Sequence, residues 1–310
     1  MDIVYACNDS YVCQTAISMV SVLKHNKEVK LHLISDHICV TNLELLKNIL
    51  SKYGSCVNII DADMVFANVS IDQQDRHPRT IYAKLFLDEL IDAERWLYLD
   101  SDVVVVGSLE ELFCRDMDDE IVAGVMMPYS SKVKKALGLE VQDSYICDGV
   151  VLFNMTKWKI KERRKACVDY MNQYDGNPLM QSEGTLNHVC KGYIGVLKPE
   201  YNVMPSMLMY TGEQIKRLFQ ASLYYDDVDI EKAKKEQKII HYMNELYNRP
   251  WLEPGKHPLK HRYQEIEYEV FKGETIKRGC LSKHTILTAW LAQHLPFTLF
   301  AMIYRIKNGE

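Results

Sequence analysis

The stretch from residue 96 to residue 106 reads Trp96-Leu97-Tyr98-Leu99-Asp100-Ser101-Asp102-Val103-Val104-Val105-Val106. Its apolar, β-prone first half predicts a buried strand that ends at two acids, and a second run of valines follows. Residues i and i+2 of an extended chain point to the same side, so Asp100 and Asp102 can converge beyond the carboxyl end of the strand. Such a pair of carboxylates is the first candidate for a functional site.

Two ionised carboxylates held this close repel each other unless a cation lies between them. A hard divalent ion such as Mg²⁺ or Mn²⁺ takes oxygen ligands, so it would remove the repulsion and could bind a diphosphate at the same time. A second interpretation needs no metal, because Asp100 and Asp102 could form a polar turn and cap a helix that begins near Ser108. Spacing alone leaves both interpretations open, since short aspartate motifs are common.

Strands and helices alternate ahead of these acids. The pattern predicts strands over 3–6, 29–34 and 57–60, and helices over 11–24 and 43–53. This alternation indicates an α/β fold with a parallel sheet, whose ligands bind beyond the carboxyl ends of the strands. The chain has neither G-x-G-x-x-G nor G-x-x-x-x-G-K-[ST], which argues against dehydrogenases and P-loop enzymes. Tyr11, just past the first strand, either stacks on a base or packs on the core.

The rest of the chain continues the pattern. We expect helices over 79–90, 158–174 and 181–190, strands over 121–125, 145–154 and 238–242, and a loop over 129–135. Lys84 in the first of these helices points either at a phosphate or into solvent. His241 ends the last strand, and although a lone histidine is more often structural, neutral imidazole suits Mn²⁺ beside a carboxylate pair.

Composition excludes several classes of protein. The 310 residues include 37 basic and 42 acidic side chains, and a net charge of -5 argues against general nucleic-acid binding. The nine cysteines are scattered and form no C-x-x-C pair, so neither a zinc framework nor a disulfide scaffold is indicated. Scattered reduced thiols, and an amino terminus that enters a strand pattern at once, predict a cytoplasmic protein.

The composition changes at the carboxyl end. Residues 277–310 carry five basic residues and one acid, a net charge of +4, around an apolar stretch rich in tryptophan, phenylalanine and leucine. Apolar bulk with cationic flanks is typical of a segment that lies on an anionic membrane surface, here the inner face of the plasma membrane. A terminal helix docked on the core or on a second subunit explains the pattern equally well.

Seven short motifs together resemble glycosyltransferase family 8. They are I-V-Y-A-C-N-D-S-Y at 3–11, Y-A-K-L-F-L at 82–87, Y-L-D-S-D-V-V-V at 98–105, D-G-V-V-L-F-N at 148–154, E-G-T-L-N at 183–187, Y-N-V-M-P at 201–205 and H-Y…R-P-W at 241–251. Each motif alone is weak, whereas seven in the right order are specific. The family comprises retaining, metal-dependent enzymes of the GT-A fold, including bacterial lipopolysaccharide galactosyl- and glucosyltransferases and glycogenin. The resemblance therefore implies an α/β fold with a mixed, mostly parallel central sheet flanked by helices.

The resemblance implies roles for individual residues. Asp100, Asp102 and His241 would bind a Mn²⁺ (or Mg²⁺) that holds the diphosphate of a UDP-sugar. Contacts to the donor are implied for Ala6, Asn8, Tyr11, Lys84, Ser101 and Arg249. Asn8 stands where the family usually has an acid, and Lys84 stands at a position that is commonly arginine, which keeps a positive charge but loses the bidentate fork.

Two further departures concern the donor sugar and the loop after His241. Ser182-Glu183 replaces the family's usual Asp-Gln, whose acid binds a sugar hydroxyl, and Asp148 is the candidate substitute. Glu183 either forms a glycosyl-enzyme or stabilises the cationic transition state, or it is simply an acid favoured at a helix amino terminus. The loop that ends in Arg249 is two residues longer than usual.

The sequence therefore predicts a retaining hexosyltransferase that moves galactose or glucose from a UDP-sugar to a glycan or lipid-linked acceptor in bacterial surface polysaccharide synthesis. The alternative is a degenerate module that binds nucleotide or glycan without catalysis, which Ser182 favours and the intact Asp100, Asp102 and His241 oppose. We expect a GT-A domain over residues 1–255 and a helical extension over 256–310.

Overall fold

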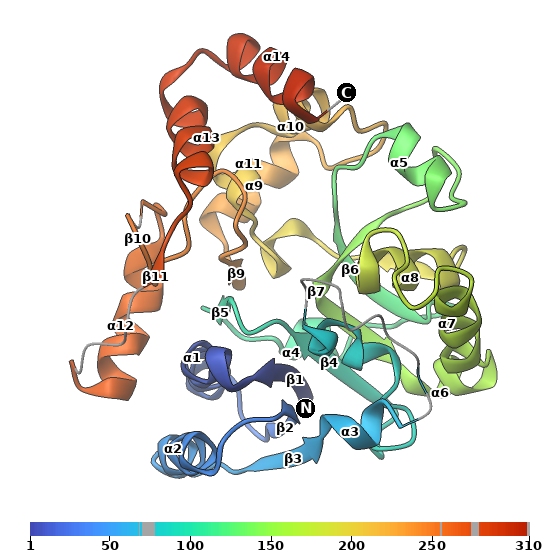
Figure 1. The fold of residues 1–310 in the computed structure, drawn as a ribbon, viewed down its shortest axis with the longest axis vertical. Coiled ribbons are helices and arrows are strands. Elements are labelled where there is room, and N and C mark those ends of the chain that lie inside the picture. The colour runs from blue at the N-terminus through green and yellow to red at the C-terminus, as the bar shows by residue number, and fades with distance from the viewer. Residues whose placement is uncertain (68, 70–77, 255, 274–278, 309–310) are drawn as a thin grey trace.

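The computed structural model of the protein describes residues 1–67, 69, 78–254, 256–273 and 279–308 (Figure 1). A seven-stranded sheet forms its centre. In order across the sheet the strands are β3 (Val57–Asp61), β2 (Lys30–Asp36), β1 (Asp2–Asn8), β4 (Arg95–Leu99), β7 (Ile146–Asn154), β6 (Val122–Met126) and β8 (Ile194–Val196). Strand β7 runs antiparallel to both of its neighbours, and the other four pairings are parallel. The predicted α/β class, with a mixed and mostly parallel sheet, is confirmed.

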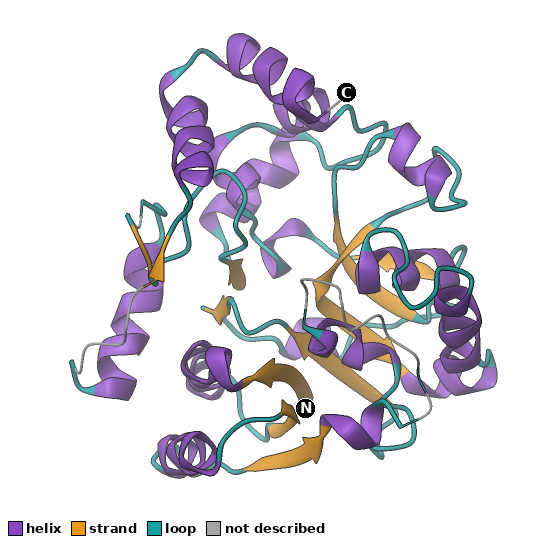
Figure 2. Ribbon diagram, viewed as in Figure 1, coloured by secondary structure: helices purple, strands orange, loops and turns teal. Residues whose placement is uncertain are grey.

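Helices cover both faces of this sheet (Figure 2). The α-helices are α1 (Val12–His25), α2 (Val40–Ser51), α3 (Ala62–Val65), α4 (Glu110–Phe113), α5 (Ser131–Ala136), α6 (Met155–Ile160), α7 (Arg163–Asn172), α8 (Gln181–Val189), α9 (Pro205–Met209), α10 (Gly212–Phe219), α11 (Asp227–Lys235), α12 (Lys260–Phe271), α13 (Lys283–His294) and α14 (Phe297–Asn308). Short 3₁₀ helices span Asp9–Tyr11 (η1), Arg79–Leu85 (η2) and Pro199–Tyr201 (η3). Strands β10 (Leu252–Glu253) and β11 (Gly279–Cys280) form a small parallel pair.

The alternation of side chains along the strands builds two cores, one on each face of the sheet. In β4, Leu97 and Leu99 belong to the core shared with α1 and α2. Their neighbours Trp96 and Tyr98 belong to the opposite core, with η2, α7 and α8. Because successive strand residues point to opposite faces, the continuous apolar run of this strand fits a sheet buried on both sides.

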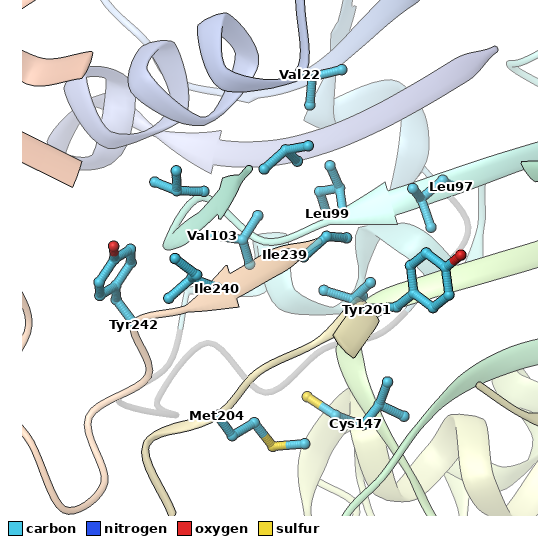
Figure 3. Close-up of a cluster of buried hydrophobic side chains, with 14 of the residues drawn as sticks. Val22, Leu97, Leu99, Val103, Cys147, Tyr201, Met204, Ile239, Ile240 and Tyr242 are labelled. Carbon is cyan, nitrogen blue, oxygen red and sulfur yellow. The ribbon is translucent and has the colours of Figure 1, made fainter. Parts of the chain in front are cut away.

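A separate two-stranded antiparallel ribbon begins just after β4 in the chain. Strand β5 (Val103–Val105) pairs antiparallel with β9 (Ile239–His241), with Val103 opposite His241. Figure 3 shows Val103, Ile239 and Ile240 packed among side chains of β4 and of the segment that carries Tyr201. This ribbon brings a histidine that lies far along the chain next to the two acids that follow β4.

Three predictions of local structure are wrong. Residues 79–90 form a 3₁₀ helix that ends at Leu85, because nearly every side chain from Thr80 to Asp88 is buried and no solvated helix face exists. The predicted loop over 129–135 contains α5, whose amino terminus is capped by Ser130. The predicted helix over 158–174 is divided at Glu162, whose left-handed backbone (φ 50°) separates α6 from α7.

Helices α13 and α14 lie at one end of the molecule beside α10 (Figure 1). Phe300 is 1% exposed, and Phe297 and Tyr304 pack on Tyr210 and Phe219. A second set of apolar side chains faces outward, namely Leu287, Trp290, Leu299, Met302 and Ile306. Of the predicted charged flanks, Lys277, Arg278 and Glu310 lie outside the described residues. Among the described helices, none is long and apolar enough to cross a membrane.

Candidate active site

Three side chains from two distant parts of the chain converge beyond the carboxyl end of β4. One ligand atom from each of Asp100, Asp102 and His241 lies within 4.8 Å of the others. His241 Nε2 is 3.1 Å from Asp102 Oδ1 and 4.0 Å from Asp100 Oδ2. Two carboxylates and one imidazole match the ligands of Mn²⁺, and the imidazole makes Mn²⁺ a better match than Mg²⁺, which prefers oxygen.

The backbone of β7 forms one wall of this group. Asp100 donates its backbone N–H to Gly149 O over 2.8 Å. A methyl group at Gly149 would lie 2.5 Å from Asp100 Oδ2 and 2.6 Å from His241 Cε1. Glycine is therefore required at this position for the carboxylate and the imidazole to approach each other, and the donor set fits a metal ion.

Opposing effects set the charges of the three groups. Burial opposes ionisation of Asp102, but the positive charges of His241 and Arg249 outweigh it and hold the pKa of Asp102 below its usual range. Burial likewise opposes protonation of His241, yet the Asp102 carboxylate raises the pKa of the imidazole. Burial raises the pKa of Asp100, although the charge of Lys84 opposes this rise. Protons and positively charged side chains therefore balance the charge of the two carboxylates at this site, a role that a bound cation can also fill.

A cavity of about 430 Å³ opens beside these groups. Its lining includes Ala6, Cys7, Asn8, Tyr11, Pro78, Thr80, Ile81, Tyr98, Asp100, Ser101, Asp102, Asn244 and Arg249. Five of the six residues assigned to the donor by resemblance therefore share one cavity with both aspartates. The sixth, Lys84, lies behind it.

Arg249 connects the two sides of the cavity. Its guanidinium donates to Asp102 Oδ2 and to the Tyr11 hydroxyl, each over 2.8 Å. Tyr11 packs partly against the core, as one of its two interpretations predicted, and it also lines the cavity, while the stacking on a base stays a prediction. Asn8 accepts hydrogen bonds from Ser10, and the Ser101 hydroxyl bonds to Thr15 over 2.8 Å. These two side chains are thus already engaged within the protein.

Lys84 is a buried cation, and the predicted solvent-facing alternative is wrong. Its side chain is 2% exposed, and its ammonium lies 2.8 Å from Asp148 Oδ2 and 3.9 Å from Asp100 Oδ1. It also lies 4.2 Å from the centre of the Tyr98 ring. The Ser182 hydroxyl donates to the same Asp148 oxygen over 2.6 Å. Asp148 belongs to β7 and Ser182 belongs to α8, so this strand and this helix together hold the Asp148 carboxylate next to the metal-ligand group.

Glu183 lies on the other side of Asp148, in the first turn of α8. Its carboxyl group accepts from the Tyr145 hydroxyl over 3.0 Å and from Asp148 N over 3.4 Å. Burial, with a contribution from the charge of Asp148, raises the pKa of Glu183 to about 8. Met180, just before α8, and Gln181, its first residue, both have left-handed backbone, and such strained backbone often accompanies functional sites.

The comparisons with known proteins bear on this geometry. The model of the glycosyl transferase family 8 matches residues 2–255. This chain belongs to glycosyl transferase family 8. The family comprises glycosyltransferase enzymes, so the predicted resemblance is confirmed.

Family 8 relatives in bacteria share modest identity with the chain. A putative glycosyltransferase of Haemophilus influenzae is 27% identical over 219 residues, which cover 66% of this chain and 64% of the relative. The lipopolysaccharide 1,2-glucosyltransferase of Escherichia coli is 30% identical over 168 residues, or 51% of this chain and 48% of the relative. The chain thus spans less than two thirds of the length of either relative.

Solved structures agree on the fold. The galactosyltransferase LgtC, in complex with donor and acceptor sugar analogues, matches with a TM-score of 0.71 at 24% identity, over 87% of this chain and 96% of LgtC. The glycosyltransferase GlyE of Streptococcus pneumoniae matches with a TM-score of 0.61 at 18% identity, over 99% of this chain and 64% of GlyE. These matches confirm the GT-A architecture that the family 8 resemblance implied.

Sequence reasoning missed part of the site of this family 8 chain. Thr80, Tyr98 and Asn244 line the cavity without having been assigned a role. Gly149 stood within a quoted motif, and only the approach of Asp100 and His241 reveals why it must lack a side chain. The signal was a glycine inside a strand pattern, which marks a close approach of the backbone to another group.

Proposed function

We propose that the protein is a retaining, metal-dependent hexosyltransferase, which transfers galactose or glucose from a UDP-sugar to a glycan or lipid-linked acceptor in bacterial surface polysaccharide synthesis. The observation that supports this proposal is the convergence of Asp100, Asp102 and His241 at the cavity lined by Ala6 and Tyr11. Such a site accommodates a metal at one end and a nucleoside at the other, which is the arrangement that a nucleoside diphosphate sugar requires.

The donor bond breaks at the anomeric carbon, and negative charge grows on the departing UDP. Mn²⁺ or Mg²⁺ held by Asp100, Asp102 and His241 would compensate that charge when bound. Arg249 adds a fixed positive charge at the same end of the cavity, and its bonds to Asp102 and Tyr11 prevent it from reorienting. The acceptor hydroxyl attacks the anomeric carbon as its bond to UDP breaks, and the hydroxyl proton passes to a phosphate oxygen of the departing UDP, so no separate acid is needed.

The first test is the release of UDP from a panel of UDP-sugars. We expect Mn²⁺-dependent release from one hexose donor, with none in EDTA, because hydrolysis of the donor reports the site without knowledge of the acceptor. A chain that binds UDP and Mn²⁺ by calorimetry, but releases UDP from no donor with or without added glycan acceptors, would instead be the degenerate binding module.

Retention of configuration at the anomeric carbon can be explained by a carboxylate such as that of Glu183. The Glu183 carboxylate, which accepts a hydrogen bond from Asp148 N, is proposed as the group that stabilises the cationic sugar or bonds to it. A carboxyl group with a pKa of about 8 is largely protonated at pH 7, so only the ionised fraction can act. We therefore expect turnover to rise with pH, to reach half of its maximum near pH 8 and to level off above that pH.

Substitution Glu183→Gln tests this role. The variant should lose most turnover and also lose the rise toward pH 8, whereas turnover within a few-fold of wild type would exclude the nucleophile. The folded protein keeps a proton that the unfolded chain releases above about pH 4.5, so the wild type loses stability as pH increases toward 8. Urea denaturation at pH 5 and pH 8 should show the Gln variant gaining stability relative to wild type at the higher pH.

We further propose that α13 and α14 hold the protein peripherally on the inner, anionic face of the plasma membrane. Leu299 and Met302 of α14 face outward, while Arg305 and Lys307 lie in its last turn. Exposed apolar residues beside cations suit the interface of an anionic bilayer. A lipid-linked acceptor would then reach the cavity from the membrane surface.

Surface substitutions test this attachment without uncovering the core. Changing Trp290, Leu299 and Met302 together to serine should reduce binding to phosphatidylglycerol vesicles in flotation assays by about tenfold, with donor hydrolysis unchanged. The matched control changes Ile160 and Val228, which are 72% and 75% exposed elsewhere on the surface. Equal vesicle binding by both variants and wild type would rule out the tail as an anchor.

A further inference from the structure

His241 is held from the side opposite the two aspartates by Asn202. The imidazole Nδ1 lies 3.0 Å from Asn202 Oδ1, while Nε2 faces Asp102. Asn202 is 0% exposed and His241 is 3% exposed, so neither contact is shared with bulk water. An amide oxygen can only accept a hydrogen bond, and the proton between these two atoms must therefore belong to Nδ1.

The backbone around Asn202 leaves its side chain little freedom. Val203 donates to Ile239 O over 2.8 Å, and His241 donates to Val203 O over 3.0 Å. These bonds place the segment that follows η3 along the edge of β9 that β5 does not occupy, and Figure 3 shows Tyr201 and Met204 on that segment. Asn202 is consequently fixed in register with His241 by strand-like pairing.

From this contact we infer that Asn202 is a positioning residue for the metal site, which keeps the proton of His241 on Nδ1 and leaves the Nε2 lone pair directed at the ion. Metal-binding histidines generally donate their other ring N–H to an acceptor, which fixes both the tautomer and the ring plane. Asp102 holds Nε2 only while that nitrogen carries a proton, so Asn202 is the partner that persists when a metal is bound. Within the described part of the chain, Asn202 Nδ2 has no partner, which indicates that the amide is buried for the sake of its oxygen.

The inference rests on the metal site of the proposed function, and binding of Mn²⁺ alone tests it. Titration of Mn²⁺ into the full chain, followed by electron paramagnetic resonance, gives an affinity that requires neither donor nor turnover. Asn202→Leu preserves the approximate volume but removes the acceptor, and we expect Mn²⁺ affinity to fall 10- to 100-fold. Asn202→Asp retains an oxygen opposite Nδ1 and should keep the affinity within about threefold of wild type.

Asn187→Leu is the matched control for loss of a buried amide. Asn187 is also 0% exposed and bonds to Ile146 and to Glu183 O, but it contacts no metal ligand. The substitution Asn187→Leu should lower the melting temperature and leave the affinity for Mn²⁺ unchanged, whereas His241→Ala should abolish Mn²⁺ binding.

The outcomes separate the inference from the proposed function. Mn²⁺ binding that His241→Ala removes and Asn202→Leu preserves would overturn the role of Asn202 alone. If Asn202→Leu does not fold, Asn202→Asp decides, because a tenfold loss of affinity in a folded variant that keeps the acceptor overturns the inference. A wild-type chain that binds no Mn²⁺ would overturn the metal site itself, and with it the role of Asn202.

Discussion

Substitution Asp102→Ala should reduce metal-dependent release of UDP on the order of 1,000-fold or more. Asp102 is the most heavily engaged member of the metal-ligand group, because one oxygen faces His241 and the other accepts from Arg249. Its removal deletes a ligand and also releases Arg249 from its position in the cavity. Initial rates with the preferred donor at saturating Mn²⁺ measure the effect.

The control for this prediction is Asp61→Ala. Asp61 also follows a sheet strand at its carboxyl end, but its side chain caps α3 and takes no part in the metal-ligand group. Loss of the cap should cost about 1 kcal/mol of stability and leave the rate near that of wild type. A rate for Asp102→Ala above a tenth of the wild-type rate would contradict the assignment of Asp102 as a metal ligand.

Lys84→Met should destabilise the fold by about 3–5 kcal/mol, the usual cost of removing one partner of a buried ion pair. The lysine is 2% exposed and its ammonium bonds to both the backbone and the carboxylate of Asp148. Without it, the carboxylates of Asp148 and Asp100, which both lie within 4 Å of this ammonium, would lose the lysine between them. Urea denaturation at pH 7 gives the free energy of unfolding.

Lys134→Met separates the loss of an ion pair from the loss of a buried lysine. Lys134 is 1% exposed as a residue, and its ammonium bonds to the carbonyl oxygens of Val141 and Asp143. Leaving two carbonyls unpaired should cost about 1–3 kcal/mol. The double variant Lys84→Met, Asp148→Asn should recover much of the loss, because it removes the uncompensated charge. Equal costs for both single variants, without recovery in the double variant, would contradict a stabilising ion pair between Lys84 and Asp148.

Some of the structure could be predicted because local patterns determine it. Strands β1, β4 and β7 carry continuous apolar runs that fit a sheet buried on both faces, and the positions of these strands and of β2 and β3 agree with the sequence. The segment over 79–90 could not be predicted, since its burial depends on tertiary contacts with β1, β2 and α3 before it in the chain and with α8 after it. Likewise, the short helix α5 has one capping serine and no apolar periodicity long enough to identify it.

In the candidate site, too, some residues could be predicted from local sequence and others depend on contacts between distant parts of the chain. Asp100 and Asp102 were evident because spacing along one strand fixes their relation. The contribution of Asn202 was not evident, because it depends on pairing between the segment after η3 and β9. The environment of Lys84 was also beyond local reasoning, since Asp148 reaches it from a strand that runs antiparallel to β4.

The position of β9 also bears on the order of events during synthesis. His241 and Asp102 are 139 residues apart, and among the described residues β9 pairs with β5 and with the segment beside Asn202. All seven strands of the main sheet precede residue 197, so the sheet can assemble on the ribosome before the imidazole has been made. Under the proposed function, a metal ion would find all three ligands only after translation has passed residue 241, and it would stabilise chains that contain His241 in preference to chains that end before it.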